Sequence, residues 1–547
     1  MKQILIIWNI LLLSHMATFS QTPYNIVINV PKNPTTEMAF NWFTTLNTTN
    51  EQVQIVIGAT TNPNSFTTPF KTANATTNQN VHKAVVADLS PNTTYSFRVG
   101  KTNLWSTIAT FTTAPAPENK VPFSFIYVTD AHAEENLQPQ TNAANIINPN
   151  ASFWMHCGDV GRDESSAETV MLERWKKFFE FQPNQIQKKP LAPVMGNHDV
   201  IHNNFFHKHF NVQNESFDTT GSTYSFIYGD AQFFAINTQR CHRREASLDS
   251  VYFNNLKTWM ETEIMAHPNI KWRIVYYHIP TYTSKISGVH NSNIADLFDE
   301  LNIDLALQGH THVHDVMGPI KDRNVVQEAI KYVTSTTATV NSNGKSGGIF
   351  NVQQGTMYFT NGAFGLKWMP LSATATAATN TDHITGKWAA NVKMGNGIVG
   401  FAFSNISVSS DNITITTYKA NNGVSEFLDE IKIVKECIPS LTTPSTTIGT
   451  QTWNIAQDKS GNITIQNGIT LTVTANITAL DCSVITIQNG GQLVVNGGTL
   501  DGFTVVAQSG SACTIQNNGK ILLKNFDDFD IQLGATLNLI SGEVSPK

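Results

Sequence analysis

The stretch Ile303-Asp304-Leu305-Ala306-Leu307-Gln308-Gly309-His310-Thr311-His312-Val313-His314 decides which fold the middle of this chain adopts. Its apolar run predicts a buried strand, and the turn after it lifts histidines out at the strand's end, where α/β sheets place their chemistry. Alternation along an extended segment puts His310 and His312 on the same side. A shared metal explains that arrangement, but histidines two apart also occur on solvated loops. The remaining ligands therefore have to come from elsewhere in the chain.

Four more predicted strands, each an apolar run, end directly before residues of metal-binding type. Residues 123–128 are followed by Asp130 and His132, residues 153–155 by Asp159, residues 191–195 by Asn197-His198-Asp199, and residues 272–277 by His278. Segments 167–181 and 253–265 lie between these strands and have helical patterning. Strands that alternate with helices predict an α/β domain, which we assign to residues 118–436.

The residues before this domain predict an all-β sandwich over 21–117. Short apolar runs are separated by Asn, Thr, Pro and Gly clusters at the spacing of a sandwich. The alternating segment from Leu89 to Val99 resembles the tyrosine-corner strand of fibronectin type III domains, and Trp42 is the expected core tryptophan. We interpret this domain as a support or docking module.

The residues after it predict a linker over 437–451 and an all-β repeat domain over 452–547. Three similar Thr-Ile-Gln-Asn segments begin at Ile463, Ile485 and Cys513. Short alternating strands with Asn-Gly turns that recur at such intervals favour a parallel β-solenoid. The alternative is a small β-sandwich. Cys482 and Cys513 lie in this region and could pair, although the total of five cysteines is odd.

The N-terminus predicts a secretory signal peptide over residues 1–20, and hence a secreted, cell-surface or periplasmic protein. Lys2 precedes a short apolar run, and small or polar residues follow. No later run is long and apolar enough to predict a transmembrane span. A net charge of -6, from 35 basic and 41 acidic residues, argues against a nucleic-acid scaffold as partner.

The order of the strand-end motifs resembles that of the calcineurin-like metallophosphoesterases, across residues 122–436. The front domain and the segment from Thr223 to Gly229 resemble the purple acid phosphatase branch of that family. The resemblance implies two packed sheets flanked by helices and two divalent metal ions, of Fe, Mn or Zn. It implies one ion bound by Asp130, His132, Asp159 and His312, and a second bound by Asp159, Asn197, His278 and His310. Carboxylate, imidazole and amide ligands independently suit such ions.

The same resemblance assigns catalytic roles beside the metals. It implies direct attack of a metal-bound hydroxide on a phosphate ester. His198 is expected to protonate the leaving oxygen, with Asp199 holding its tautomer. The alternative is that Asp199 pins a merely structural histidine.

The chain also departs from the purple acid phosphatases. Their tyrosine ligand, three residues after the bridging aspartate, is replaced by Arg162, and they lack a histidine at the position of His132. Divalent ions are therefore expected in place of a ferric ion. Arg162, His290 and His314 are weaker candidates for substrate binding, against salt-bridge or solvated-loop roles.

We therefore expect a secreted binuclear-metal phosphoesterase that acts on phosphate monoesters. One alternative is a phosphodiesterase for nucleotides or lipid headgroups. A second is a surface adhesion or carbohydrate-binding protein, in which the C-terminal domain attaches to a cell surface or a polysaccharide.

Overall fold

The structure is a computed structural model, and it falls into two compact units, Met1–Val434 and Lys435–Lys547. Each unit is described by itself. The described residues are 22–546 apart from 46–49, 68–70, 75, 79, 133–136, 162–167, 182–187, 201–204, 220, 241–248, 284–291, 313, 327–328, 334–346, 366–400, 422, 436–445, 460, 480–482 and 524–528.

The first unit begins with a β domain of two sheets, as predicted. Trp42 is fully buried in its core, and the Tyr95 hydroxyl accepts a hydrogen bond of 2.8 Å from the Ser90 backbone N–H. That bond closes the corner that the alternating segment predicted. Its strands are β1 (Tyr24–Asn29), β2 (Met38–Phe43), β3 (Gln52–Ile57), β4 (Lys71–Asn74), β5 (Thr76–Asn78), β6 (Val81–Val86), β7 (Thr94–Lys101), β8 (Leu104–Trp105) and β9 (Ala109–Thr112).

The α/β part of the first unit contains two sheets packed face to face. One sheet has 12 strands in the order β19-β20-β24-β23-β22-β10-β11-β12-β1-β2-β6-β5, and the other has seven in the order β13-β14-β15-β16-β21-β17-β18. The first includes β10 (Phe123–Val128), β11 (Trp154–His156), β12 (Leu191–Pro193), β19 (Ile330–Val333), β20 (Gly347–Asn351), β22 (Phe401–Val408), β23 (Asn412–Asn421) and β24 (Val424–Val434). The second comprises β13 (Tyr224–Tyr228), β14 (Ala231–Ala235), β15 (Trp272–Tyr276), β16 (Leu305–Gln308), β17 (His314–Lys321), β18 (Asn324–Val325) and β21 (Thr356–Asn361).

The larger sheet runs through both domains, which the sequence did not predict. Strand β1 of the front domain pairs in parallel with β12, with Asn29 opposite Leu191. The Asn29 side-chain amide also donates a hydrogen bond to the Leu191 carbonyl at 3.0 Å. The front domain is therefore joined to the α/β domain by shared backbone pairing as well as by a linker.

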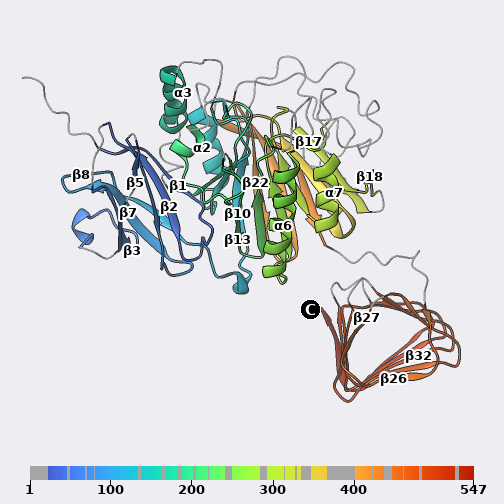
Figure 1. Ribbon diagram of the computed structural model, residues 1–547. Coiled ribbons are helices and arrows are strands. Elements are labelled where there is room, and N and C mark those ends of the chain that lie inside the picture. The colour runs from blue at the N-terminus through green and yellow to red at the C-terminus, as the bar shows by residue number, and fades with distance from the viewer. Residues whose placement is uncertain are drawn as a thin grey trace, which may run out of the picture. The chain divides into compact units, whose positions relative to one another are not determined.

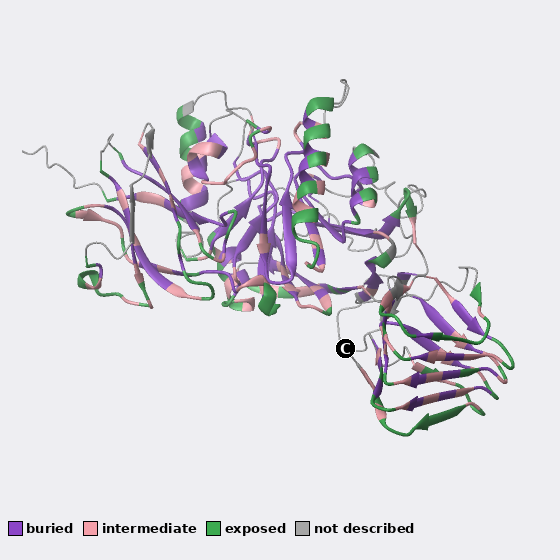
Figure 2. Ribbon diagram, turned by 60° about the horizontal axis from the view of Figure 1, so that its bottom comes forward, coloured by how far each residue is buried: buried purple, intermediate pink, exposed green. Residues whose placement is uncertain are grey.

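Helices cover the outer faces of both sheets (Figure 1). They are α2 (Leu137–Ile147), α3 (Glu168–Phe181), α5 (Phe205–His209), α6 (Ser250–Ala266) and α7 (Ser292–Leu301). Buried side chains of α6 and α7 pack against β14, β15 and β16, and those of α2, α3 and α5 pack against β10 and β11. A third apolar layer, which includes Phe125 and Ile274, lies between the sheets. Figure 2 shows the strands buried and the outer helix faces exposed. The predicted α/β class is confirmed.

The second unit contains three parallel five-stranded sheets, in the orders β25-β28-β31-β34-β37, β26-β29-β32-β35-β38 and β27-β30-β33-β36-β39. Each strand from β25 to β36 pairs with the third one after it. The strands are β25 (Thr446–Thr447), β26 (Gln451–Trp453), β27 (Gln457–Lys459), β28 (Ile463–Ile465), β29 (Thr470–Val473), β30 (Asn476–Ala479), β31 (Val484–Ile487), β32 (Gln492–Asn496), β33 (Thr499–Asp501), β34 (Thr504–Ala507), β35 (Ala512–Gln516), β36 (Gly519–Leu523), β37 (Phe529–Ile531), β38 (Thr536–Leu539) and β39 (Gly542–Pro546).

One detail of the repeat prediction is wrong. Ile463 does pair in register with Ile485, but Cys513 lies in a different sheet, opposite Leu493. The interval from Ile485 to Cys513 therefore does not mark a structural repeat, because the similar residues lie on strands of different sheets. Cys513 carries a free, buried thiol, and its possible partner Cys482 lies outside the described residues.

Candidate metal centre

Five loops bring the predicted ligands together at the carboxyl ends of the central strands. Strands β10, β11 and β12 lie parallel in the first sheet, and β15 and β16 lie parallel in the second. Loops that follow parallel strands meet at one edge of a sheet. The side chains that they deliver are Asp130 and His132, Asp159, Asn197, His198 and Asp199, His278, and His310 and His312.

The first group consists of Asp130, His132, Asp159 and His312, all buried and with ligand atoms within 4.8 Å of one another. His132 Nε2 lies 3.0 Å from His312 Nε2, and His312 Nε2 lies 3.0 Å from Asp130 Oδ1. His132 Nε2 is also 3.9 Å from Asp159 Oδ2. Four donor atoms thus face one small volume.

The second group shares Asp159 with the first and adds His278 and His310. His278 Nε2 lies 3.1 Å from Asp159 Oδ2. The Asn197 side-chain oxygen is 3.0 Å from His278 Nε2 and 2.7 Å from His310 Nδ1. One carboxylate therefore belongs to both groups, in the position of a bridge.

The donor geometry fits metal ions better than a purely hydrogen-bonded cluster. Asp130 Oδ1 is buried and has no hydrogen-bond partner, although His312 Nε2 lies only 3.0 Å away. A close contact without hydrogen-bond geometry is what two ligands of one ion present to each other. Ligands at right angles around an ion, with bonds of about 2.1 Å, lie about 3 Å apart. Oxygen and imidazole donors without thiolates suit Zn, Mn or Fe.

The backbone of these loops is strained at the ligands themselves. Asp130, His132, Asp159, His310 and His312 all have φ between 52° and 73°, in the left-handed region. Such residues cost about 1–2 kcal/mol each and concentrate at functional sites. Glycine supplies the close approaches nearby, since a Cβ at Gly196 would lie 2.1 Å from the Asp159 backbone nitrogen.

Burial and mutual charge set the protonation of the cluster. Burial lowers the pKa of His132 and of His310 to about 4. Burial also lowers the pKa of His278, but the negative charge of Asp159 outweighs it and raises the value to about 9. Burial raises the pKa of Asp130, yet the charge of His312 and the other imidazoles holds it well below its ordinary range. Neutral His132 and His310 beside ionised carboxylates have the protonation that metal binding requires.

Neighbouring groups orient the ligands, and the sequence pattern did not single these groups out. The His278 Nδ1–H faces the Cys157 carbonyl at 2.7 Å, which directs Nε2 toward Asp159 and Asn197. The Thr129 hydroxyl donates to Asp130 Oδ2 at 2.6 Å, and the His310 backbone N–H donates to the same oxygen at 2.9 Å. The signal for Thr129 is its place directly before the first ligand.

His198 lies beside the cluster with a partly exposed ring. Its ring centre is 5.0 Å from that of His132, and its backbone N–H donates to Asp159 Oδ1 at 2.8 Å. Asp199 accepts hydrogen bonds from the backbone N–H groups of Gly161 at 3.0 Å and Gly196 at 2.9 Å. Burial, and then the charge of Asp159, raise the pKa of Asp199 to about 7. Asp199 therefore ties the Asp159 loop to the Asn197 loop, and its action on His198 stays a prediction.

Of the three weaker candidates, the described structure covers only His314, which belongs to neither donor group. Arg162 and His290 lie outside the described residues. His314 is buried on β17, and its Nε2 lies 2.7 Å from Asp429 Oδ2 of β24. His209 of α5 is not part of the cluster either, since α5 turns it toward the core, where it is buried against Trp175 and Phe179.

Two stretches of this chain match known protein families. Residues 123–314 match the calcineurin-like phosphoesterase family, and their match covers all the strand ends that carry the cluster. The central domain is a calcineurin-like phosphoesterase domain. Residues 23–113 match the family described as purple acid phosphatase, N-terminal domain. The two matches confirm the predicted family resemblance of the central domain and of the front domain.

Individual relatives of this chain are distant. An uncharacterized protein of Mycobacterium tuberculosis, found in strains CDC 1551 / Oshkosh and H37Rv, is 22% identical over 331 residues, which are 53% of this chain and 61% of the relative. The chain thus spans less than two thirds of that relative. The structure of purple acid phosphatase PPD1 from yellow lupin (Lupinus luteus) seeds is 14% identical with a TM-score of 0.55, covering 76% of this chain and 74% of the lupin chain. This likeness concerns the fold.

Proposed function

We propose that this protein is a secreted phosphoesterase with a two-metal centre that hydrolyses phosphate monoesters. The observation that carries the proposal is the pair of buried donor groups that share Asp159. A shared carboxylate holds two ions close enough to act on one phosphoryl group. The match to the calcineurin-like phosphoesterase family supports the same reaction class.

In this proposal the chain's own residues hold the ions, orient the ester and move one proton. Asp130, His132, Asp159 and His312 bind one ion, and Asp159, Asn197, His278 and His310 bind the other. When bound, two divalent ions supply an activated water and stabilise the attacking and leaving oxygens. His198, whose side chain is 22% exposed beside the cluster, is proposed to protonate the leaving oxygen.

The metals proposed are two divalent ions. Arg162 occupies the place at which the purple acid phosphatases carry a tyrosine ligand, and His132 adds an imidazole. A nitrogen and carboxylate set without a phenolate favours Zn, Mn or Fe in the divalent state. Arg162 and His290 are proposed to contact the phosphate, since a guanidinium and an imidazole both donate to its oxygens.

The remaining finer points concern the two ends of the chain. Lys2 and the apolar run after it support export through a signal peptide. None of the helices among the described residues is long and apolar enough to cross a membrane. We propose that the three parallel sheets of residues 446–546 form a β-solenoid, because each strand from β25 to β36 pairs with the third one after it. That domain is proposed to attach the enzyme to a cell surface or a polysaccharide.

The test compares nitrophenyl phosphate with bis-nitrophenyl phosphate, using protein that has been freed of metal and reloaded with Zn, Mn or Fe. We expect turnover of the monoester only in reloaded protein, with two ions bound per chain. Asp159→Asn should lose at least one ion and nearly all turnover. Full activity after chelation would refute the metal mechanism, and preference for the diester would replace the monoesterase by a phosphodiesterase.

His198→Ala tests the proton donor. Hydrolysis of esters whose leaving groups need protonation should slow by roughly 10²–10⁴-fold. Hydrolysis of nitrophenyl phosphate, whose leaving group is nitrophenolate, should slow far less. His207→Ala serves as a control, because His207 is a histidine of α5 that the proposal gives no role. An equal loss for good and poor leaving groups would remove His198 from that role.

A further inference from the structure

A two-lobed groove lies at the opposite end of the central strands from the metal ligands. One lobe has a volume of about 380 Å³ and the other about 450 Å³, and both are lined by Pro122, Phe123, Asn150 and Ser152. The groove meets β10 at its first residue, Phe123, whereas Asp130 follows the last. The length of this strand separates the two places by about 20 Å. The groove is therefore distinct from the metal centre.

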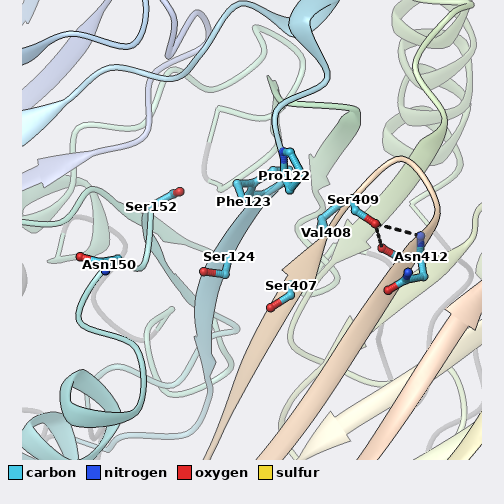
Figure 3. Close-up of a pocket in the computed structure, with 9 residues that line it drawn as sticks. All are labelled: Pro122, Phe123, Ser124, Asn150, Ser152, Ser407, Val408, Ser409 and Asn412. Atoms are coloured by element: carbon cyan, nitrogen blue, oxygen red, sulfur yellow. Dashed lines mark hydrogen bonds between the residues drawn. The ribbon is translucent and has the colours of Figure 1, made fainter.

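The smaller lobe is lined mainly by hydroxyl and amide groups. Ser124 of β10 pairs in register with Ser407 of β22. Figure 3 shows these two serines on adjacent strands, with Asn150 and Ser152 on the segment beside them. The side chains of Asn150 and Ser407 form no hydrogen bond with another described residue, so both can bind a ligand.

The larger lobe adds positive charge to the same chemistry. It contains Asn92, Thr110 and Thr112 of the front domain, and Lys188 and Lys189 from the segment before β12. Burial lowers the pKa of Lys189, and no described carboxylate lies within ion-pair distance of either lysine. The described residues that line the two lobes include no Asp or Glu, in a protein whose net charge is -6. The groove is thus a local positive site in an acidic protein.

We propose that this groove binds an acidic oligosaccharide. The hydroxyl and amide groups of the smaller lobe hydrogen-bond the sugar hydroxyls, and the exposed Pro122 gives an apolar surface for a sugar ring. Lys188 and Lys189 bind the carboxylate, sulfate or phosphate that the chain carries. Both lobes are as large as the pockets in which proteins commonly bind small molecules. Binding here leaves the metal centre accessible.

The experiment measures binding of the full-length, metal-loaded protein to four probes by calorimetry. The probes are oligogalacturonate, sulfated dextran oligosaccharide, uncharged dextran oligosaccharide and inorganic phosphate. We expect the two acidic oligosaccharides to bind most tightly. Lys188→Met and Lys189→Met keep the apolar stem and remove the charge. Each should weaken binding of the acidic probes by roughly tenfold, the value of one charge-assisted hydrogen bond.

Lys120→Met is the matched control, because Lys120 lies near the groove but pairs with Asp230 at 3.7 Å and does not line either lobe. It should leave binding unchanged, and all three variants should keep wild-type turnover of nitrophenyl phosphate. Equal affinity for charged and uncharged dextran would overturn the proposal, as would unchanged binding in the lysine variants. Binding of phosphate with no gain from the sugar chain would reduce the site to one for a small anion and also overturn it. Because turnover is measured separately, a failure here leaves the proposed phosphoesterase activity to its own test.

Discussion

Asp429→Ala should loosen the turn that carries His310 and His312, because it breaks a buried contact between the two sheets. His314 lies on β17 of the smaller sheet, two residues after His312, and Asp429 lies on β24 of the larger sheet. Their side chains approach to 2.7 Å, Nε2 to Oδ2, and are only 1% and 6% exposed. The charge of Asp429 outweighs burial and raises the pKa of His314.

The magnitude follows from this burial. Water screens a pair so little exposed only weakly, and removal of one partner from a buried pair costs about 3–5 kcal/mol. We expect Asp429→Ala to lower the free energy of unfolding of the first unit by about 3 kcal/mol. Asp429→Asn keeps the shape and an acceptor oxygen, so its expected loss is about 1 kcal/mol. Glu426→Ala on the same strand, where the side chain is 61% exposed, should cost less than about 0.5 kcal/mol.

Urea unfolding measures the loss, and hydrogen exchange of the peptide spanning β17 locates it. Exchange should speed up in β17 for Asp429→Ala and stay at the wild-type rate in the sheets of residues 446–546. Metal affinity should fall in the same variant, since the turn with two proposed ligands moves more freely. If Asp429→Ala lowers the free energy of unfolding no more than Glu426→Ala does, the stabilising role of the His314–Asp429 contact is refuted.

Three further predictions concern the metals, a buried lysine and the loop brace. Saturation with metal at about one hundred times Kd should stabilise the wild type by about 3 kcal/mol per site, and Asp159→Asn should lose most of this gain in thermal unfolding. Burial lowers the pKa of Lys83 to about 8, so the unfolded chain binds the extra proton between pH 8 and 10.5 and stability rises with pH there. The wild type should therefore gain up to about 3 kcal/mol relative to Lys83→Met across that window, and a constant difference would contradict the assignment. Asp199→Ala should leave the N–H groups of Gly161 and Gly196 unpaired and lower the free energy of unfolding by about 2 kcal/mol. The metal content of the variant should fall as well. An unchanged metal content would show that the hydrogen bonds of Asp199 are not needed to hold the two loops.

The strand-end pattern identified most residues that the fold brings together. Parallel pairing of β10, β11 and β12 follows from their apolar runs and helical connections, and it places the residues after each strand at one edge. Local composition was equally informative for the front domain, where Trp42 and Tyr95 occupy the expected core. In the last domain, the sequence similarity at Cys513 gave a wrong repeat interval, because the similar segments lie on strands that are not equivalent.

The sequence by itself determined the class of each domain, the donor types and their order along the chain, since these depend on local periodicity and on chemistry. The family resemblance implied that Asp159 is shared by both groups, but only the tertiary structure decided how closely the donors face one another and that five of these residues have a left-handed backbone. The same holds for the His314–Asp429 contact and for the sheet shared through β1 and β12. These features join residues far apart in sequence. The sequence around one residue of such a pair does not indicate which distant residue it contacts.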